Sequence, residues 1–288
     1  MKKRKVVVEI YRLSADKKQR DVLLTLENLA VRFKITKYRG TVFSQGTISV
    51  CGLSQEHINQ LTTFQGAYLA AQNDKYIRLT AGYVEETDDE SAVIFDGLIF
   101  KAIPTMPPDI WLNMEVFSNL DLVSEEKEIS IENTTSKNLV KKIASEFSVP
   151  VVLDYSTSNK RIDKFYFKGN LPSLERKLYE MLKNDKIFYY EQGKIIVDDW
   201  AKTNRPSVPY LINVENGMVF MPKPTTYGCD VSIFLNPFFQ MSQIAKIEST
   251  QIPSLNGDYT VYMLTHEGTS RDVPFYTHLS CMRIPSNV

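Results

Sequence analysis

Residues 256–261 read Asn-Gly-Asp-Tyr-Thr-Val, preceded by Leu-Asn-Pro at 235–237 and followed by His-Glu-Gly-Thr at 266–269 and Phe-Tyr-Thr at 275–277. Asn-Gly is the pair most typical of a tight hairpin turn, because both central positions of that turn need a positive φ. The stretch therefore predicts a strand, an Asn-Gly turn, a second strand, a polar turn at 266–269 and a final strand.

The same pattern extends over the C-terminal part of the chain. A polar segment with two prolines, residues 201–210, predicts a linker. Beyond it, short apolar runs separated by turn residues predict strands at 218–221, 228–235, 244–249, 258–266 and 276–282. We expect a β unit over residues 206–288.

The N-terminal part, residues 1–120, also predicts strands. Residues 29–38 alternate clearly, with Val31, Phe33 and Ile35 on one face and Arg32, Lys34 and Thr36 on the other. Similar runs are found at 6–11, 46–51, 76–83, 92–103 and 110–120. This spacing predicts an antiparallel sheet that curls into a barrel or a sandwich. Ser54 is the expected N-cap of a short helix that ends near residue 63.

The middle of the chain, residues 121–205, has the sequence pattern of a small α/β module. Apolar residues spaced three and four apart predict helices over 138–147 and 172–183. Strands are expected at 149–153 and 164–167, and a hairpin at 187–197 that turns at 191–193. The sequence thus predicts a mainly β, α+β protein with domains at 1–120, 121–205 and 206–288, whose middle module can add strands to the second β unit.

Composition limits the possible partners. The 288 residues carry 34 basic and 34 acidic side chains, so no net charge draws the chain to nucleic acid or to an anionic membrane. Three widely spaced cysteines, Cys51, Cys229 and Cys281, predict neither a disulfide framework nor a zinc site, and we expect buried thiols in a reducing compartment. We expect no signal peptide and no membrane span.

Motifs for catalysis or cofactor binding are missing from the sequence. It contains no phosphate-binding loop and no HExxH, and its three histidines, His57, His266 and His278, lie in no hydrolase-like context. We expect His57 on the short helix, His266 at the end of a strand and His278 within the last strand. No catalytic residue, metal site or cofactor is therefore predicted.

Two charged segments allow alternative interpretations. The acidic run at 85–90 is expected to be a solvated hairpin loop rather than a cation site, because it lacks calcium-loop spacing. The basic residues nearest to a nucleic-acid motif are Arg32, Lys34, Lys37 and Arg39, together with Tyr38. An exposed face of an ordinary antiparallel sheet has the same pattern.

Three groups of motifs resemble the baseplate hub family of contractile-tailed phages. The first is residues 46–54 with the helix that follows, although Cys51-Gly52 stands where a Tyr-Asn-like pair is more usual. The second is the order helix, strand, helix and hairpin over residues 136–197. The third comprises residues 217–222, 227–232, 235–237 and 256–277.

This resemblance implies two tail-tube-like antiparallel β-barrels plus the α/β module. It also implies a non-enzymatic homotrimer whose six barrels form a pseudo-sixfold ring. Such a ring joins the tail tube, or a tube adaptor, to the central spike, contacts other baseplate proteins, and continues the DNA channel without binding DNA specifically. The implied location is the virion tail, assembled in the host cytoplasm without stable membrane association. The alternatives are a tail component that binds host-surface or cell-wall glycan, and a peptidoglycan hydrolase.

Overall fold

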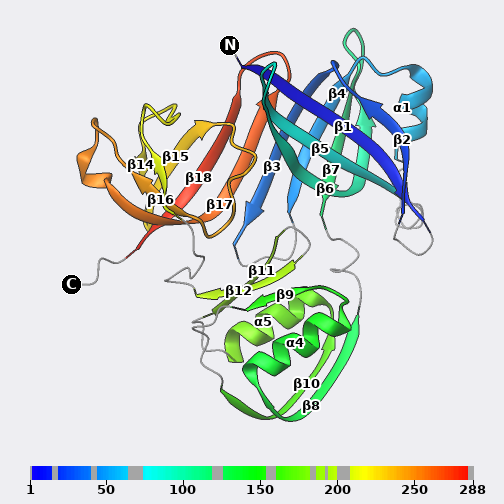
Figure 1. The fold of residues 1–288 in the computed structure, drawn as a ribbon. Helices are drawn as coiled ribbons and strands as arrows, with labels where there is room; N and C mark the ends of the chain where they lie inside the picture. The colour runs from blue at the N-terminus through cyan, green and yellow to red at the C-terminus, as the bar shows by residue number, and fades with distance from the viewer. Residues whose placement is uncertain are drawn as a thin grey trace.

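The computed structural model describes residues 2–14, 19–39, 44–63, 74–118, 126–153, 160–181, 186–191, 194–199 and 208–284. One large sheet forms the upper half of the molecule in Figure 1, and a smaller α/β module lies below the ends of β3 and β17. No helix among these residues has the length and apolar character that crossing a membrane requires.

The N-terminal strands form the first β unit. Its sheet order is β3-β4-β7-β6-β5-β1-β2, with every neighbouring pair antiparallel. The elements are β1 (Lys3–Leu13), β2 (Arg20–Leu26), β3 (Ala30–Tyr38), β4 (Gln45–Cys51), α1 (Gln55–Leu61), β5 (Lys75–Val84), β6 (Asp89–Pro104) and β7 (Trp111–Phe117).

The C-terminal strands form the second β unit, in which β17 is central. Its second half pairs with β3 and its first half with β16, while β18 runs along its other side and is followed by β15 and β14. The elements are β13 (Tyr210–Ile212), β14 (Lys223–Pro224), β15 (Gly228–Phe234), β16 (Ile244–Ile247), the 3₁₀ turn η1 (Pro253–Leu255), β17 (Gly257–Thr269) and β18 (Phe275–Arg283).

Pairing of β3 with β17 joins the two units into one 13-stranded sheet. Its main path runs from β14 to β2, and no pairing in the described part of the chain closes it into a barrel. The sequence prediction of a mainly β fold is confirmed, whereas the two separate barrels are not seen. The units also share a core, because Leu235 and Phe275 of the second unit lie in the hydrophobic cluster of the first.

The α/β module has its own sheets. It contains β8 (Lys127–Thr135), α4 (Ser136–Glu146), β9 (Val151–Leu153), β10 (Arg161–Gly169), α5 (Leu171–Met181), β11 (Lys186–Glu191) and β12 (Lys194–Asp199). β8 pairs with β10, and β9, β12 and β11 form a second small sheet, so none of these strands joins the large sheet. Both expected helices are present, and the N-cap of α4 is Thr135, whose hydroxyl accepts from the Asn138 amide.

Several local predictions need correction. His-Glu-Gly-Thr at 266–269 is not a turn but the end of β17, and the turn lies at 270–274. The expected strand at 218–221 is reduced to one bridge, between Met218 and Ile233, because the prolines at 222 and 224 interrupt the ladder. β2, β8, β13 and β14 were not predicted. The linker at 201–210 and the hairpin turn at 192–193 lie largely outside the described residues.

The Asn-Gly pair is also not a two-residue turn. β16 and β17 are joined by residues 248–256, in which the Asn256 side chain accepts from the Ser249 amide at 2.7 Å. Gly257 does take the predicted positive φ, at +144°. The glycine is therefore placed where the chain enters β17 from a longer, side-chain-supported loop.

Replacing Gly257 with valine should destabilise the fold by about 1–2 kcal/mol. A Cβ at this position would meet only the Arg283 guanidinium, at 3.8 Å, so the expected loss comes from backbone strain rather than from a clash. Thermal unfolding of Gly257→Val and Gly257→Ala measures it, and the two should lose similar amounts. If both variants melt at the same temperature as the parent chain, Gly257 does not need its positive φ.

Candidate functional site

The solvent-facing side of the shared sheet is continuous across the junction of the two units, and we call it the open face. Strand register places one row of side chains across it, and the row contains Phe234, Tyr276, Glu267, Lys34, Thr47, Glu115 and Lys101. The next row contains Ser232, His278, Thr265, Thr36 and Gln45. Polar side chains therefore span seven strands drawn from both units.

Basic groups on the open face are matched by acidic or aromatic neighbours. Lys34 Nζ lies 3.1 Å from Glu267 Oε2, and Lys101 Nζ lies 3.3 Å from Glu115 Oε1. The Arg32 guanidinium stacks 4.2 Å above the Trp111 ring. Each pair is a cross-strand contact of the kind that stabilises sheets. The face is thus polar without being strongly basic.

This arrangement separates the basic residues that lie closest to a nucleic-acid motif in the sequence. Arg32 and Lys34 do point the same way, as expected. Arg39, by contrast, is buried, and strand alternation places Lys37 on the opposite side, where its charge acts on His266. The basic residues therefore do not form one phosphate-binding surface.

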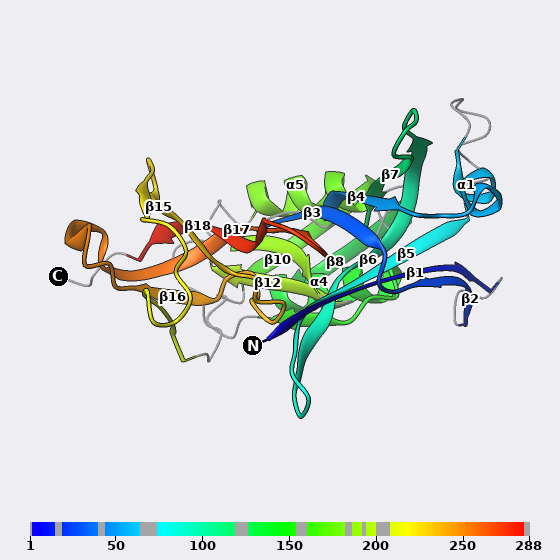
Figure 2. The ribbon, with the colours of Figure 1, turned by 90° about the horizontal axis from the view of Figure 1, so that it is seen from above.

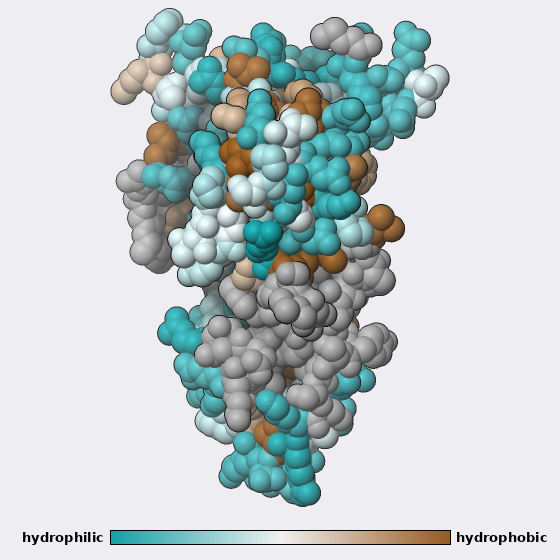
Figure 3. All heavy atoms as spheres, turned by 90° about the vertical axis from the view of Figure 1, so that its left-hand side faces the viewer, coloured by the Kyte–Doolittle hydropathy of each residue, from teal (hydrophilic) through white to brown (hydrophobic). Residues whose placement is uncertain are grey.

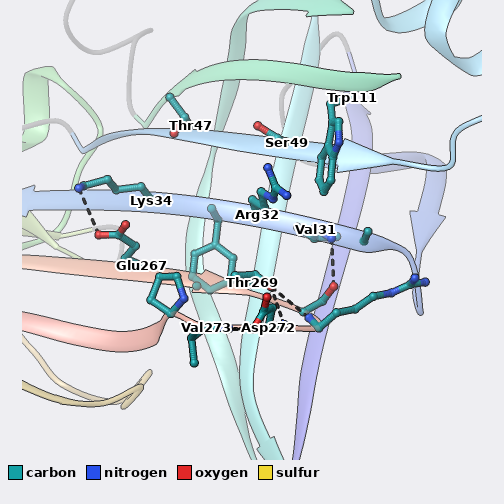
Figure 4. A pocket seen from close by; sticks show the side chains of 16 residues that line it. Val31, Arg32, Lys34, Thr47, Ser49, Trp111, Glu267, Thr269, Asp272 and Val273 are labelled. Carbon is teal, nitrogen blue, oxygen red and sulfur yellow. Dashed lines mark hydrogen bonds and ion pairs between the residues drawn. The ribbon is translucent and has the colours of Figure 1, made fainter. Parts of the chain in front are cut away.

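A groove of about 440 Å³ lies on the open face where β3 and β4 meet the turn between β17 and β18. Figure 4 shows Arg32, Trp111 and Ser49 on one wall and, on the other, Thr269 at the end of β17 and Asp272 in the turn that follows. The Ser270 hydroxyl accepts from the Val31 amide at 3.0 Å and donates to the Leu29 carbonyl at 2.8 Å, so this turn is fixed to β3. The groove is consequently part of the junction between the two units.

Strand pairing also brings together a serine, a histidine and a glutamate. Ser232 Oγ lies 2.8 Å from His278 Nδ1, and His278 Nε2 lies 3.7 Å from Glu267 Oε2. These residue types match a nucleophile, a base and an orienting acid. The sequence did not indicate this group, because the three residues come from β15, β18 and β17 and meet only through the sheet register.

The surroundings of this group do not suit acyl transfer. Glu267 is engaged closer to Lys34 than to His278, and burial lowers the pKa of His278, although Glu267 opposes that shift. Acyl transfer also needs hydrogen-bond donors aimed at the developing oxyanion. On a strand face the backbone N–H groups lie in the plane of the sheet and are used in the β15–β18 and β17–β18 ladders. The three residues are better described as a hydrogen-bonded cross-strand row.

Esterase and peptidoglycan-hydrolase assays should therefore give the same background signal for the parent chain and for Ser232→Ala. The comparison variant is Ser173→Ala, whose hydroxyl contacts Asn170 far from this row. Turnover by the parent chain that is lost in Ser232→Ala and kept in Ser173→Ala would establish a catalytic serine instead.

His266 lies on β17 next to Glu267, and its side chain points to the opposite face of the sheet. It is fully buried, and its Nδ1 lies 3.0 Å from Thr277 Oγ1. Burial, with smaller effects of Lys37 and His278, moves the pKa of His266 well below its usual value. This histidine is a neutral side chain of the interior, not the end of a strand as predicted.

Acidification should therefore weaken the fold in a defined pH range. With a depressed folded-state pKa, the stability that His266 contributes is complete above the unfolded value of about 6.5 and is lost as pH falls below it, by up to about 1.4 kcal/mol per pH unit. His278, whose pKa is also lowered, acts in the same direction. Melting temperatures at pH 7.5 and 5.5 measure the loss. His266→Gln should reduce the difference between them, and an unchanged difference contradicts this origin.

The remaining candidates from the sequence have structural partners or none of the groups needed for a metal site. His57 lies on α1 as predicted, and its amide donates to the Ser54 cap at 3.2 Å. In the acidic hairpin, Asp89 and Glu90 pair with Lys5 and Lys2. In the described part of the chain no group of His, Cys, Asp or Glu is arranged to hold a metal. The three cysteines are unbridged, and Cys229 and Cys281 are buried as predicted, whereas Cys51 is partly exposed.

Solved structures of similar fold are phage tail proteins and a secretion component. A 43 kDa tail protein of prophage MuSo2 from Shewanella oneidensis matches with a TM-score of 0.64 and 8% identity, over 97% of this chain and 98% of that one. A tail protein from Neisseria meningitidis MC58 matches at 0.61 and 8% identity, over 96% of both chains. An Escherichia coli component of the type VI secretion system matches at 0.58 and 9% identity, over 90% of this chain and 74% of that one.

No curated protein matches the sequence. A family model does match it, and that family is described as baseplate hub gp41. The match covers residues 5–281, which include both β units and the α/β module. The chain therefore belongs to the baseplate hub gp41 family of phage tail proteins.

Proposed function

We propose that this chain is the structural hub of a contractile tail baseplate. Three copies form a pseudo-sixfold ring that joins the tail tube, or a tube adaptor, to the central spike and continues the DNA channel. The ring contacts other baseplate proteins and has no catalytic activity. It is assembled in the host cytoplasm and retained in the virion.

The observation that carries this proposal is the joining of two β units in one sheet through β3 and β17. A trimer of such a chain presents six β units, which is the number needed to match a sixfold tube to a threefold spike. We assign the units to domains 1–120 and 206–288 and the α/β module to domain 121–205. The similar secretion component supports the assignment, since it is described as resembling the phage T4 tail proteins gp27 and gp5.

We further assign the part of the open face from β17 to β6, which leaves out Phe234 and Tyr276 on β15 and β18, to the wall of the bore. A surface that DNA must slide past should not hold phosphates, because each phosphate contact with a free lysine or arginine adds a salt-dependent contribution to the affinity. On the open face Lys34 and Lys101 are each paired with a glutamate, and Arg32 is covered by Trp111. Uncharged polar side chains such as Thr36 and Ser49 lie in the neighbouring rows.

Removing the paired carboxylates tests this assignment. The double variant Glu267→Gln/Glu115→Gln exposes the charges of Lys34 and Lys101 and should bind a labelled DNA duplex at least several-fold more tightly than the parent chain at low salt. The matched control is Glu128→Gln/Glu132→Gln, which changes the charge equally on the α/β module, where Glu132 pairs with Lys164. Equal DNA affinity of both double variants excludes the open face as the bore wall.

Electron microscopy of the purified chain tests the ring itself. Class averages should show threefold particles with a central opening and six peripheral lobes. Particles without an opening, or retention of the chain by cell-wall glycan in place of tube and spike proteins, would favour a glycan-binding tail component.

A further inference from the structure

The main path of the large sheet has two ends, and both expose apolar side chains. They lie on opposite sides of the molecule in Figure 1, with β14 and β15 on the left and β2 on the right, and the view from above in Figure 2 shows the same separation. A protein whose opposite ends both carry unpartnered apolar surface has the two faces that a head-to-tail contact between identical copies requires.

The first surface, which we call the aromatic end, surrounds Tyr276. The Phe220 ring lies 5.7 Å and the Phe234 ring 6.5 Å from the Tyr276 ring. Phe220, Met221, Phe234 and Phe238 are each more than half exposed. Figure 3 looks onto this side of the molecule, and hydrophobic side chains there are gathered in patches among hydrophilic ones on the half that carries the sheet.

The exposed area at the aromatic end is that of a principal surface patch. At roughly 200 Å² per side chain, the four residues, each about half exposed, together leave roughly 450 Å² of apolar surface uncovered. The largest apolar patch on a typical monomeric protein is comparable in size and is often functional. A standard protein interface covers about 800 Å² on each partner, so the patch is the size of an interface core with a polar rim around it.

The second surface, the β2 end, is an open strand edge. Among the described strands, β2 pairs with β1 alone. Val22 and Leu23 on this strand are 52% and 43% exposed, and the strand contains no proline. Strands left this way at a sheet edge tend to bind another chain. At the other end of the sheet, Pro222 and Pro224 prevent strand addition, so contact there must be made by side chains.

We propose that the aromatic end of one copy packs against the β2 end of the next copy, and that three such contacts close the ring. This inference rests on the proposed hub function and names the surfaces through which the copies meet. The interface is heterologous, so each copy supplies one aromatic end and one β2 end.

Variants that block one end each provide the test. Phe220→Glu/Phe238→Glu places charge at the aromatic end without touching the β15 ladder, and Val22→Glu/Leu23→Glu does so at the β2 end. Each variant alone should be a monomer by light scattering. An equimolar mixture should form heterodimers of twice the 33.0 kDa chain mass and no trimers, because only one intact contact remains.

Controls separate this inference from the proposed function. Tyr166→Glu introduces the same charge on an exposed aromatic residue of the α/β module and should leave the trimer intact. If both charged variants still form the trimer that the parent chain forms, the proposed contact between the two ends is wrong, but the ring itself is not. A parent chain that remains monomeric at every concentration overturns the ring as well.

A cross-linking measurement applies if the charged variants fail to fold. In a Cys51→Ser background, Phe220→Cys and Leu23→Cys together should give disulfide-linked dimers and trimers on oxidation, since the other two cysteines are buried. Either cysteine alone should give no trimer. Equal cross-linking by the single and double variants contradicts a contact between the two ends.

Discussion

Phe275→Ala is expected to lower the free energy of unfolding by about 3–5 kcal/mol, the largest effect of any substitution considered for this chain. Phe275 belongs to β18 of the second unit, yet its ring is buried in the core of the first. It contacts Phe33 edge-on with ring centroids 6.1 Å apart and Tyr83 at 5.3 Å, and the Arg4 guanidinium lies 4.9 Å from its ring. Removing it opens a cavity between elements that are distant in sequence.

The neighbouring strand residue Gly268 shows how closely the Phe275 ring packs. A Cβ on Gly268 would meet the Phe33 ring at 2.5 Å and the Phe275 ring at 2.8 Å, so the two rings already fill the space over the strand. Chemical denaturation of Phe275→Ala measures the loss. Met106→Ala, which truncates an exposed methionine, is the control and should change stability by less than about 1 kcal/mol. Similar losses in the two variants would mean that Phe275 does not hold the units together.

Asp96→Asn is expected to destabilise the first unit by about 2 kcal/mol. Asp96 on β6 accepts from Arg20 Nη2 at 2.9 Å, from Arg78 Nη2 at 3.1 Å and from the Tyr11 hydroxyl. One carboxylate therefore ties β6 to β5, β1 and β2. An amide of the same shape turns one acceptor into a donor and removes the charge that Arg20 and Arg78 share, while Arg78 keeps its longer contact with Glu9 at 3.8 Å.

Thermal and chemical unfolding measure this loss, with Asp163→Asn as the control. Asp163 pairs with Arg161 at 3.5 Å, but both side chains are largely exposed, so its loss should change stability by less than about 1 kcal/mol. Spectroscopic titration of tyrosine gives a second readout. Burial and, next, the Asp96 contact raise the pKa of Tyr11, so Asp96→Asn should lower it. Equal stability of Asp96→Asn and Asp163→Asn would mean that Asp96 does not hold these strands together.

Local pattern predicted most of the strands for a clear physical reason. In β3 the alternation of Val31, Phe33 and Ile35 with polar residues reflects one buried and one open face. β2 was missed because its sequence, Arg-Asp-Val-Leu-Leu-Thr-Leu, does not alternate at an exposed edge. β8 was missed because its polar residues face solvent beside β10.

Long-range pairing was beyond the reach of such patterns. The register of β3 against β17 joins residues 32–38 to residues 263–269, and nothing local specifies it. His266 seemed to belong to a turn because polar residues surround it in sequence, but β18 and β3 flank its strand and bury it. The row of Ser232, His278 and Glu267 has the same origin and becomes visible only with the sheet assembled.

Light scattering of the purified chain across a concentration series tests directly whether three copies form the hub ring. We expect a stable species at three times the 33.0 kDa chain mass, with the monomer increasing only on dilution. A single species at 33.0 kDa throughout the series would contradict the hub ring.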